Sequence, residues 1–244
     1  MYDYVSLTAT MPTGFSINDF KLKRAVCELR YDKSYLIFDR TGQVYHDLKT
    51  IIPDLDVTNA HPMNSIAQSE KGVFVVEVGQ CRVTVDNPES TLQEFANTCK
   101  SFFDIVTKQL EISVFARIGL RSIFRCEFKD LAKARETLAS LKLINLEEGP
   151  RFGIDLPASE VSFRWQNDEI GTLFRLAAES TTIDLMIPVE TEEQKIHKKV
   201  IALTLDIDSY TVVPAERAQW DPTAWIPQSI RRTRKEADKI VSRF

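Results

Sequence analysis

The sequence lacks the features that assign many chains to a class at first sight: long apolar runs, paired cysteines and a complete catalytic motif. A membrane-spanning helix needs about 20 consecutive apolar residues, and the apolar runs here are far shorter. Residues 1–15 also lack the basic segment followed by an apolar one that marks a secretory signal peptide. We therefore expect a cytoplasmic protein without a membrane partner.

Motifs for metal binding and nucleophilic catalysis are missing as well. No two of the four cysteines have the C-x-x-C spacing of zinc or redox sites, and the three histidines lie in separate segments without a cysteine or acid at ligand spacing. No serine has a G-x-S-x-G setting. We interpret the cysteines as buried free thiols and the histidines as surface or hydrogen-bonded side chains, with a metal site or catalytic base at His61 as the alternative. The sequence indicates no cofactor.

What is present is an ordinary globular composition, with 43% hydrophobic and 27% charged residues and a net charge of −4. The 244 residues are enough for one large core or two smaller ones. A general nucleic-acid-binding protein usually carries a basic domain, so the acidic balance disfavours that class. Local basic patches are still compatible with it.

The longest strand pattern covers residues 112–128, with the sequence ISVFARIGLRSIFRCEF. Apolar residues occupy alternate positions, with only Ser122 interrupting the set, and such a period of two is typical of a half-buried strand. Arg117, Arg121 and Arg125 share the opposite face, at successive distances of roughly 13 Å. The pattern predicts a strand with an apolar underside and a row of three guanidinium groups, which we call the arginine ridge.

Apolar spacing predicts further elements on both sides of this strand. Residues 88–110 have apolar residues three and four apart, typical of an amphipathic helix on which Phe102 or Phe103 is buried. Residues 53–71 are polar and irregular, which predicts a mobile loop. A strand is expected at 21–31, and it is a candidate edge strand because neither of its faces is purely apolar. The other expected elements are a helix at 42–52, a hairpin at 72–86, a helix at 129–143, strands at 160–166, 170–179, 182–189 and 199–213, and a helix at 222–244 that Pro227 interrupts.

The order of these elements predicts an α+β fold with a mostly antiparallel sheet and long helices on one face. Strand, helix, strands and long helix occur twice, which favours two structurally related α+β halves, an N-terminal one at 1–128 and a C-terminal one at 129–244. No sequence repeat accompanies this order. A single irregular α+β domain is therefore the alternative.

Residues 117–128, RIGLRSIFRCEF, resemble the R-I-G-L-R-Y-x-N-R-I signature of a sporadically distributed family of uncharacterised bacterial proteins. AVCELRY at 25–31 and LTLDIDSY at 203–210 resemble an early and a late strand of that family, which also ends in a helix. Ser122 and Phe124 stand where the family has tyrosine and asparagine, so no role of those two side chains carries over. The resemblance implies a bacterial, intracellular protein of about this size and adds no catalytic residue.

The arginine ridge is the first candidate site. Guanidinium groups bind phosphate in a bidentate fork, so Arg117, Arg121 and Arg125 are candidates for binding a phosphate or a polyanion. The structural alternative is that they pair with acidic residues on neighbouring strands, as cross-strand partners commonly do.

Asp206 and Asp208 form the second candidate site. They share one face of the strand at 199–213, roughly 7 Å apart, and a D-x-D pair can hold Mg²⁺ together with substrate phosphates. No third carboxylate or glycine-rich phosphate loop accompanies them. The alternative is that these aspartates pair with the arginine ridge, and we expect Arg117 and Arg121 to meet Asp206 or Asp208.

The third candidate is the basic run on the C-terminal helix, which includes Arg231, Arg232 and Lys235. Such a run can contact nucleic acid or an acidic partner, and it can equally be a solvated helix face. Because no set of catalytic residues is complete, we interpret the chain as an intracellular, non-enzymatic binding module. The macromolecule that we expect it to recognise is another protein. The alternatives are an Mg²⁺-dependent enzyme for a phosphorylated substrate and nucleic-acid binding through the C-terminal helix.

Overall fold

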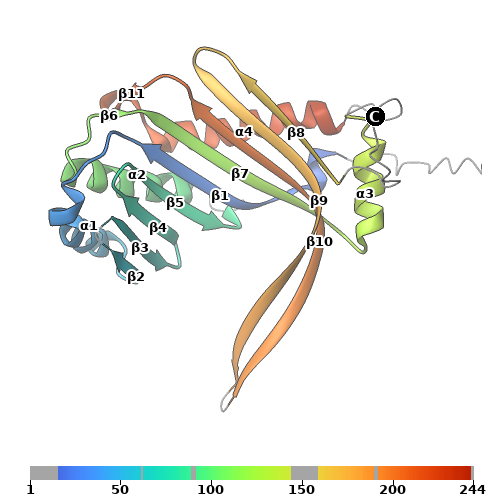
Figure 1. The fold of residues 1–244 in the computed structure, drawn as a ribbon, viewed down its shortest axis with the longest axis horizontal. Coiled ribbons are helices and arrows are strands. Elements are labelled where there is room, and N and C mark those ends of the chain that lie inside the picture. Colours follow the sequence, from blue (N-terminus) through green and yellow to red (C-terminus); the bar gives the residue numbers. More distant parts are fainter. Residues whose placement is uncertain (1–15, 62, 89–91, 144–158, 190–191, 243–244) are drawn as a thin grey trace, which may run out of the picture.

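One antiparallel sheet organises the chain in the computed structural model, which describes residues 16–61, 63–88, 92–143, 159–189 and 192–242, without the side chains of 183–198. Its nine strands follow one another in the order β2-β3-β4-β5-β1-β7-β10-β9-β8 (Figure 1). They are β1 (Lys21–Arg30), β2 (Asp56–His61), β3 (Asn64–Ser69), β4 (Gly72–Glu77), β5 (Gln80–Asp86), β7 (Arg117–Phe128), β8 (Glu160–Gln166), β9 (Ile170–Val189) and β10 (Glu192–Thr211). Two short strands, β6 (Val114–Phe115) and β11 (Ala215–Glu216), form a separate ladder. The predicted α+β fold with a mostly antiparallel sheet is confirmed.

The strand with the arginine ridge, β7, lies in the interior of the sheet, between β1 and β10. Its alternation separates the two faces as predicted, because Ile118, Leu120 and Phe124 are buried and Arg121 is exposed on the opposite side. Successive side chains of a strand point to opposite faces, so the same alternation continues in register on both neighbouring strands.

Three long helices, α1 (Ile37–Ile51), α2 (Leu92–Gln109) and α4 (Pro222–Val241), cover the apolar face, and α3 (Leu131–Ser140) stands at the end of β7 (Figure 1). Phe102 of α2 packs on Phe74 of β4, with ring centroids 5.4 Å apart. Phe102 and Phe103 are both buried, as predicted. Burying one such side chain contributes about 1.5–3 kcal/mol, so α2 is a main contributor to the core.

The bounds of α3 and α4 follow from their caps. Asp130 accepts a hydrogen bond from the backbone N–H of Lys133, and Asp221 accepts one from that of Thr223, with Pro222 at the first helical position of α4. Contrary to the sequence prediction, Pro227 does not interrupt α4, which is continuous to Val241.

Several element predictions were wrong. The polar segment expected as a loop at 53–71 contains β2 and β3, which pair with each other, and β3 also pairs with β4. The expected edge strand at 21–31 is β1, which lies inside the sheet between β5 and β7. The first helix starts at Ile37 rather than at residue 42, and the two strands expected within 170–189 are one strand, β9.

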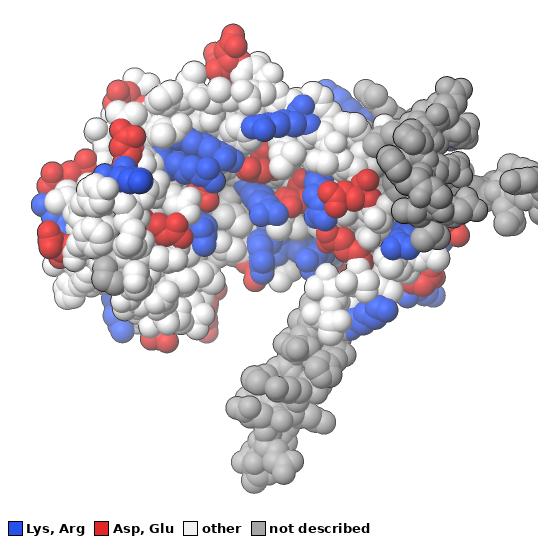
Figure 2. Space-filling model, viewed as in Figure 1, with Lys and Arg blue, Asp and Glu red and all other residues white. Residues whose placement is uncertain are grey.

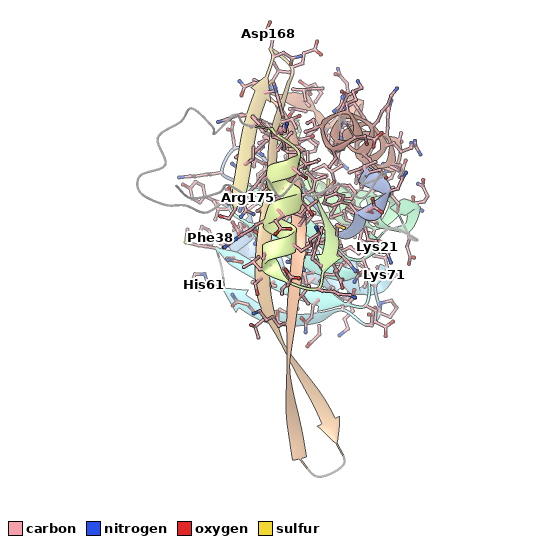
Figure 3. The ribbon with its side chains drawn as sticks, turned by 90° about the vertical axis from the view of Figure 1, so that its right-hand side faces the viewer. Lys21, Phe38, His61, Lys71, Asp168 and Arg175 are labelled. Atoms are coloured by element: carbon pink, nitrogen blue, oxygen red, sulfur yellow. The ribbon has the colours of Figure 1, made fainter. Side chains whose placement is uncertain are left out.

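The strands β9 and β10 form a long hairpin. Among the described residues, 181–189 and 192–200 pair only with each other, while 171–177 of β9 also pair with β8 and 201–210 of β10 also pair with β7. The outer part extends away from the sheet as an arm (Figure 1), and Asp168, in the turn between β8 and β9, lies at the opposite end (Figure 3).

The order of strands is similar on the two sides of the β1–β7 pair. β1 is followed by α1, four strands of the sheet and α2, and β5 returns to lie beside β1. β7 is followed by α3, three strands of the sheet, the short β11 and α4, and β10 returns to lie beside β7. The sheet is continuous across this pair, and the division into halves at residue 128 stays a prediction. Within the described ranges, no helix has both the length and the hydropathy that crossing a bilayer requires.

Candidate binding surface on the open face of the sheet

The face of the sheet opposite α1, α2 and α4, which we call the open face, carries the arginine ridge. Figure 2 shows lysine and arginine side chains gathered over its middle. The register places alternate residues of β5, β1, β7 and β10 on this face, because residues directly opposite each other in a ladder point to the same side. These four strands therefore bring together charged residues that lie far apart in the sequence.

Two residues of the arginine ridge pair with the two aspartates of β10, as predicted. Arg121 donates from Nε to Oδ1 of Asp206 at 2.9 Å and from Nη2 to Oδ2 at 2.5 Å, and Arg117 donates from Nη2 to Oδ2 of Asp208 at 2.7 Å. Hydrogen bonding to Asp206 raises the pKa of Arg121 above its ordinary value, against the opposing effect of burial. The side chain of Asp206 is 11% exposed and that of Arg121 is 53% exposed, so the pair is buried at the carboxylate and open at the guanidinium group.

Arg125, the third residue of the ridge, is half-buried and makes no ion pair or hydrogen bond with the described part of the chain. Carboxylates therefore bind two of the three arginines, Arg117 and Arg121, whereas none of the described residues binds Arg125 in this way.

The neighbouring strands contribute further paired arginines that the sequence analysis did not single out. Arg24 of β1 donates to both carboxylate oxygens of Asp86, at 2.6 and 3.2 Å. Arg30 pairs with Glu28 at 2.7 Å, and Arg82 of β5 lies 3.7 Å from Glu77. The sequence shows that Arg24, Glu28 and Arg30 share one face of β1, because they occupy alternate positions. It does not show that this face lies in the middle of the sheet, because that depends on the pairing of β1 with β5 and β7.

Tyr210 of β10 lies beside Arg117, at one end of the arginine ridge. Its ring lies 4.1 Å from the guanidinium carbon of Arg117, and its hydroxyl accepts hydrogen bonds from Nε and Nη2 of Arg164 at 3.1 and 2.7 Å. A Cβ atom at Gly171 would overlap this ring, so glycine at that position leaves the space that the tyrosine occupies. Cation–π contact and hydrogen bonding together fix the ring over the sheet.

Two adjoining hollows lie on the open face. One has a volume of about 440 Å³ and is lined by five arginines, Arg24, Arg30, Arg82, Arg117 and Arg121, and by the acids Glu28 and Asp208. The other has a volume of about 790 Å³ and is lined by the acids Asp54, Asp56, Glu70 and Asp86, by several apolar side chains of β3–β5 and by Arg24 and Arg82. The two share Arg24, Arg82 and Thr84 and form one groove, basic over β1 and β7 and acidic toward β2.

The alternative metal site at Asp206 and Asp208 would compete with the arginine pairing. Both oxygens of Asp206 and one of Asp208 already accept hydrogen bonds from guanidinium groups. Among the described residues, no three His, Cys, Asp or Glu side chains are grouped so that they could hold a metal ion.

The basic residues of the C-terminal helix lie elsewhere. Arg231, Arg232 and Lys235 are exposed on α4, on the helix-covered side of the sheet, and make no ion pair within the described ranges. The fold therefore separates the arginine ridge and the basic helix into two surfaces.

The remaining sequence candidates give no further site. His61 is exposed at the end of β2, and its Nδ1 accepts a hydrogen bond from the N–H of Met63 at 3.3 Å. Cys27, Cys81 and Cys99 are buried free thiols and Cys126 is half-buried. Burial raises the pKa of the Cys81 and Cys99 thiols well above their ordinary value, which makes them poor nucleophiles.

Comparison with known proteins adds no family. No protein-family model matches the sequence, and no curated protein matches it. The resemblance of residues 117–128 to a family of bacterial proteins therefore stays a prediction.

Proposed function

We propose that the protein is a non-enzymatic binding module that recognises a segment of a partner protein in the groove on the open face of its sheet. The observation that carries this proposal is the groove itself, which joins an arginine-lined hollow to an acidic one across β3, β4, β5, β1 and β7.

The size of the groove favours a macromolecule. Neighbouring strands lie roughly 4.8 Å apart, so five adjacent strands span on the order of 20 Å. An extended peptide of about six residues covers that distance at roughly 3.3 Å per residue. A small metabolite would fill one hollow and leave the other empty.

The mixed charge of the groove favours protein over nucleic acid. A nucleic-acid backbone is uniformly negative, and the acids Asp54, Asp56, Glu70 and Asp86 would repel it from one half of the groove. A polypeptide can place an acidic residue against the arginines and a basic or apolar one at the acidic end. Charge complementarity of this kind sets the orientation and specificity of a partner more than its affinity.

The ion pairs on the open face support binding rather than catalysis. Pairing fixes the arginine side chains before a partner arrives, which lowers the entropy cost of binding. A guanidinium group also has more N–H donors than one carboxylate accepts, so the paired arginines still offer donors to the groove. The side chain of Arg121 is 53% exposed while it is bound to Asp206, so a partner in the groove can reach it.

Site-specific photo-crosslinking in the producing cell tests the proposal. A photoreactive amino acid at Val73, which is exposed within the groove, is expected to give a discrete adduct with one protein that mass spectrometry identifies. The same amino acid at Lys49, exposed on α1, is the control. Equal adducts from the two positions, or none from Val73, would contradict the proposal.

Two alternatives have direct tests. If Asp206 and Asp208 formed an Mg²⁺ site, calorimetry would detect Mg²⁺ or Mn²⁺ binding that Asp206→Asn abolishes; we expect none, because Arg121 occupies both oxygens of Asp206. Nucleic-acid binding through α4 is the other alternative, supported by the exposed Arg231, Arg232 and Lys235, which form no ion pair with the part of the chain that the structure describes. Salt-sensitive DNA binding that is lost on charge reversal of those three residues would favour it.

A further inference from the structure

A separate hollow of about 410 Å³ lies on the helix-covered side of the sheet, between α4 and the strands β8, β9 and β10. Its volume falls within the range of small-ligand sites, roughly 300–1,000 Å³. It shares no lining residue with the groove on the open face, so an inference about it stands apart from the proposed function.

The hollow is present because small side chains of the sheet lie opposite small side chains of α4. On the helix-facing side of β10, the buried Leu205 and Ile207 are followed by Ser209, and on β9 Thr172 takes the place next to the large Phe174. The residues of α4 that line the same space include Thr233 and Ala237, which are also small. A well-packed helix–sheet contact would be filled by larger apolar side chains here, so the gap is encoded by sequence.

The walls are apolar with a few hydroxyl groups. Ile170, Ile207 and Ile240 line the hollow, and Trp165, whose ring is packed 6.2 Å from that of Phe174 but is 49% exposed, stands at its rim. The hydroxyls of Thr172 and Ser209 lie 3.4 Å apart within it. Mostly apolar walls with a small number of polar groups are typical of small-molecule sites.

Two cations, Lys239 and Arg232, and the carboxylate of Glu236 line the mouth of the hollow, and the hydrogen bond from Lys239 together with the charge of Arg232 lowers the pKa of Glu236. Lys239 donates to both carboxylate oxygens of Glu236, at 2.7 and 2.8 Å, so these two charges compensate each other. Arg232 also lines the hollow but makes no ion pair or hydrogen bond within the described residues. A guanidinium group beside an apolar hollow matches a carboxylate on an apolar body.

We propose that this hollow binds a small amphipathic carboxylate, with its apolar body against Trp165 and Ile207 and its carboxylate group at Arg232. The sequence analysis identified Arg232 as part of a basic run that could bind a macromolecule. In the structure Arg232 lines the hollow, whereas its neighbour Arg231 does not.

Calorimetric titration of the full chain with sodium decanoate, below its micelle concentration, tests this site, with tryptophan fluorescence as a second readout. Decanol is the uncharged probe of the same length, and Arg231→Gln is the matched control for Arg232→Gln, because Arg231 is exposed on the same helix but does not line the hollow.

We expect saturable decanoate binding that Arg232→Gln weakens by about tenfold or more, while Arg231→Gln leaves it unchanged and neither substitution alters decanol binding. Trp165→Phe should remove the fluorescence change and keep the calorimetric signal. Absence of saturable decanoate binding, or an equal loss in the Arg231→Gln and Arg232→Gln variants, would overturn the proposal.

Discussion

Arg121 and Asp206 form a diagonal pair between β7 and β10. The register places Asp208 directly opposite Arg121, yet the guanidinium group binds both oxygens of Asp206, and Asp208 instead accepts from Arg117. Each aspartate of β10 is therefore bound by one arginine of β7. The pairing holds Arg117, Arg121 and Asp208, which line the basic hollow of the groove.

Removing Asp206 should destabilise the fold more than removing Asp208. Asp206 is the more buried carboxylate and accepts two charged hydrogen bonds. We expect Asp206→Ala to lower the free energy of unfolding by about 1–3 kcal/mol and Asp208→Ala by about 0.5–1 kcal/mol, measured by urea denaturation. Asp168→Ala, in the exposed turn between β8 and β9, is the control and should have no measurable effect. An equal, negligible effect of all three substitutions would show that the pairs do not hold the sheet together.

The core beneath α2 gives a second prediction. Phe102 is fully buried against Phe74, so Phe102→Ala should cost about 3–5 kcal/mol in thermal or urea unfolding. Phe38→Ala, on the exposed side of α1, should change stability by no more than about 0.5 kcal/mol. A small effect at Phe102 would mean that α2 does not carry the core.

Gly171→Ala should displace Tyr210, because the new Cβ would overlap its ring. The ring would lose the contact with Arg117 and the hydrogen bonds from Arg164, and we expect a loss of about 1–3 kcal/mol. Gly42→Ala, in α1 with open space around the glycine, should instead stabilise the protein, by about 0.5–1 kcal/mol. In a Tyr210→Ala background the cost of Gly171→Ala should disappear; its persistence there would show that another contact is responsible.

The buried thiols predict a loss of stability at alkaline pH. Burial raises the pKa of Cys126 to about 11, whereas a cysteine in an unfolded chain titrates near 8.5. Between about pH 8.5 and 11 the unfolded chain releases a proton that the folded chain retains, so the free energy of unfolding falls as the pH rises. The burial of Cys81 and Cys99 acts with the same sign. Urea midpoints across this range should decrease, and less steeply in Cys126→Ala; equal slopes in the two proteins would contradict the assignment to Cys126.

Features that depend on local apolar periodicity could be predicted from the sequence, whereas the positions of strands within the sheet could not, because they depend on pairing with distant strands. The apolar underside of β7, the buried face of α2 and the pairing of Arg117 and Arg121 with Asp208 and Asp206 followed from periods of two and of three to four. Because neither face of β1 is purely apolar, its sequence predicts an edge strand, and only the pairing with β5 and β7 shows that it lies inside the sheet.

Two further errors have the same cause. β2 was missed because all six of its residues are exposed, so no apolar alternation marks it and only its pairing with β3 makes it a strand. The hollow beside α4 could not be predicted, because it depends on Ser209 and Thr172 meeting Thr233 and Ala237 from a helix later in the chain.

The most direct test of the groove is the affinity of the partner protein identified by crosslinking at Val73, measured by calorimetry with purified components. Charge reversal of the two arginines shared by both hollows, Arg24→Glu and Arg82→Glu, should weaken binding by about tenfold or more each. Lys49→Glu, which makes the same change of charge on α1, should leave the affinity unchanged. Unchanged affinity in both arginine variants, or an equal loss with Lys49→Glu, would contradict recognition through the open face.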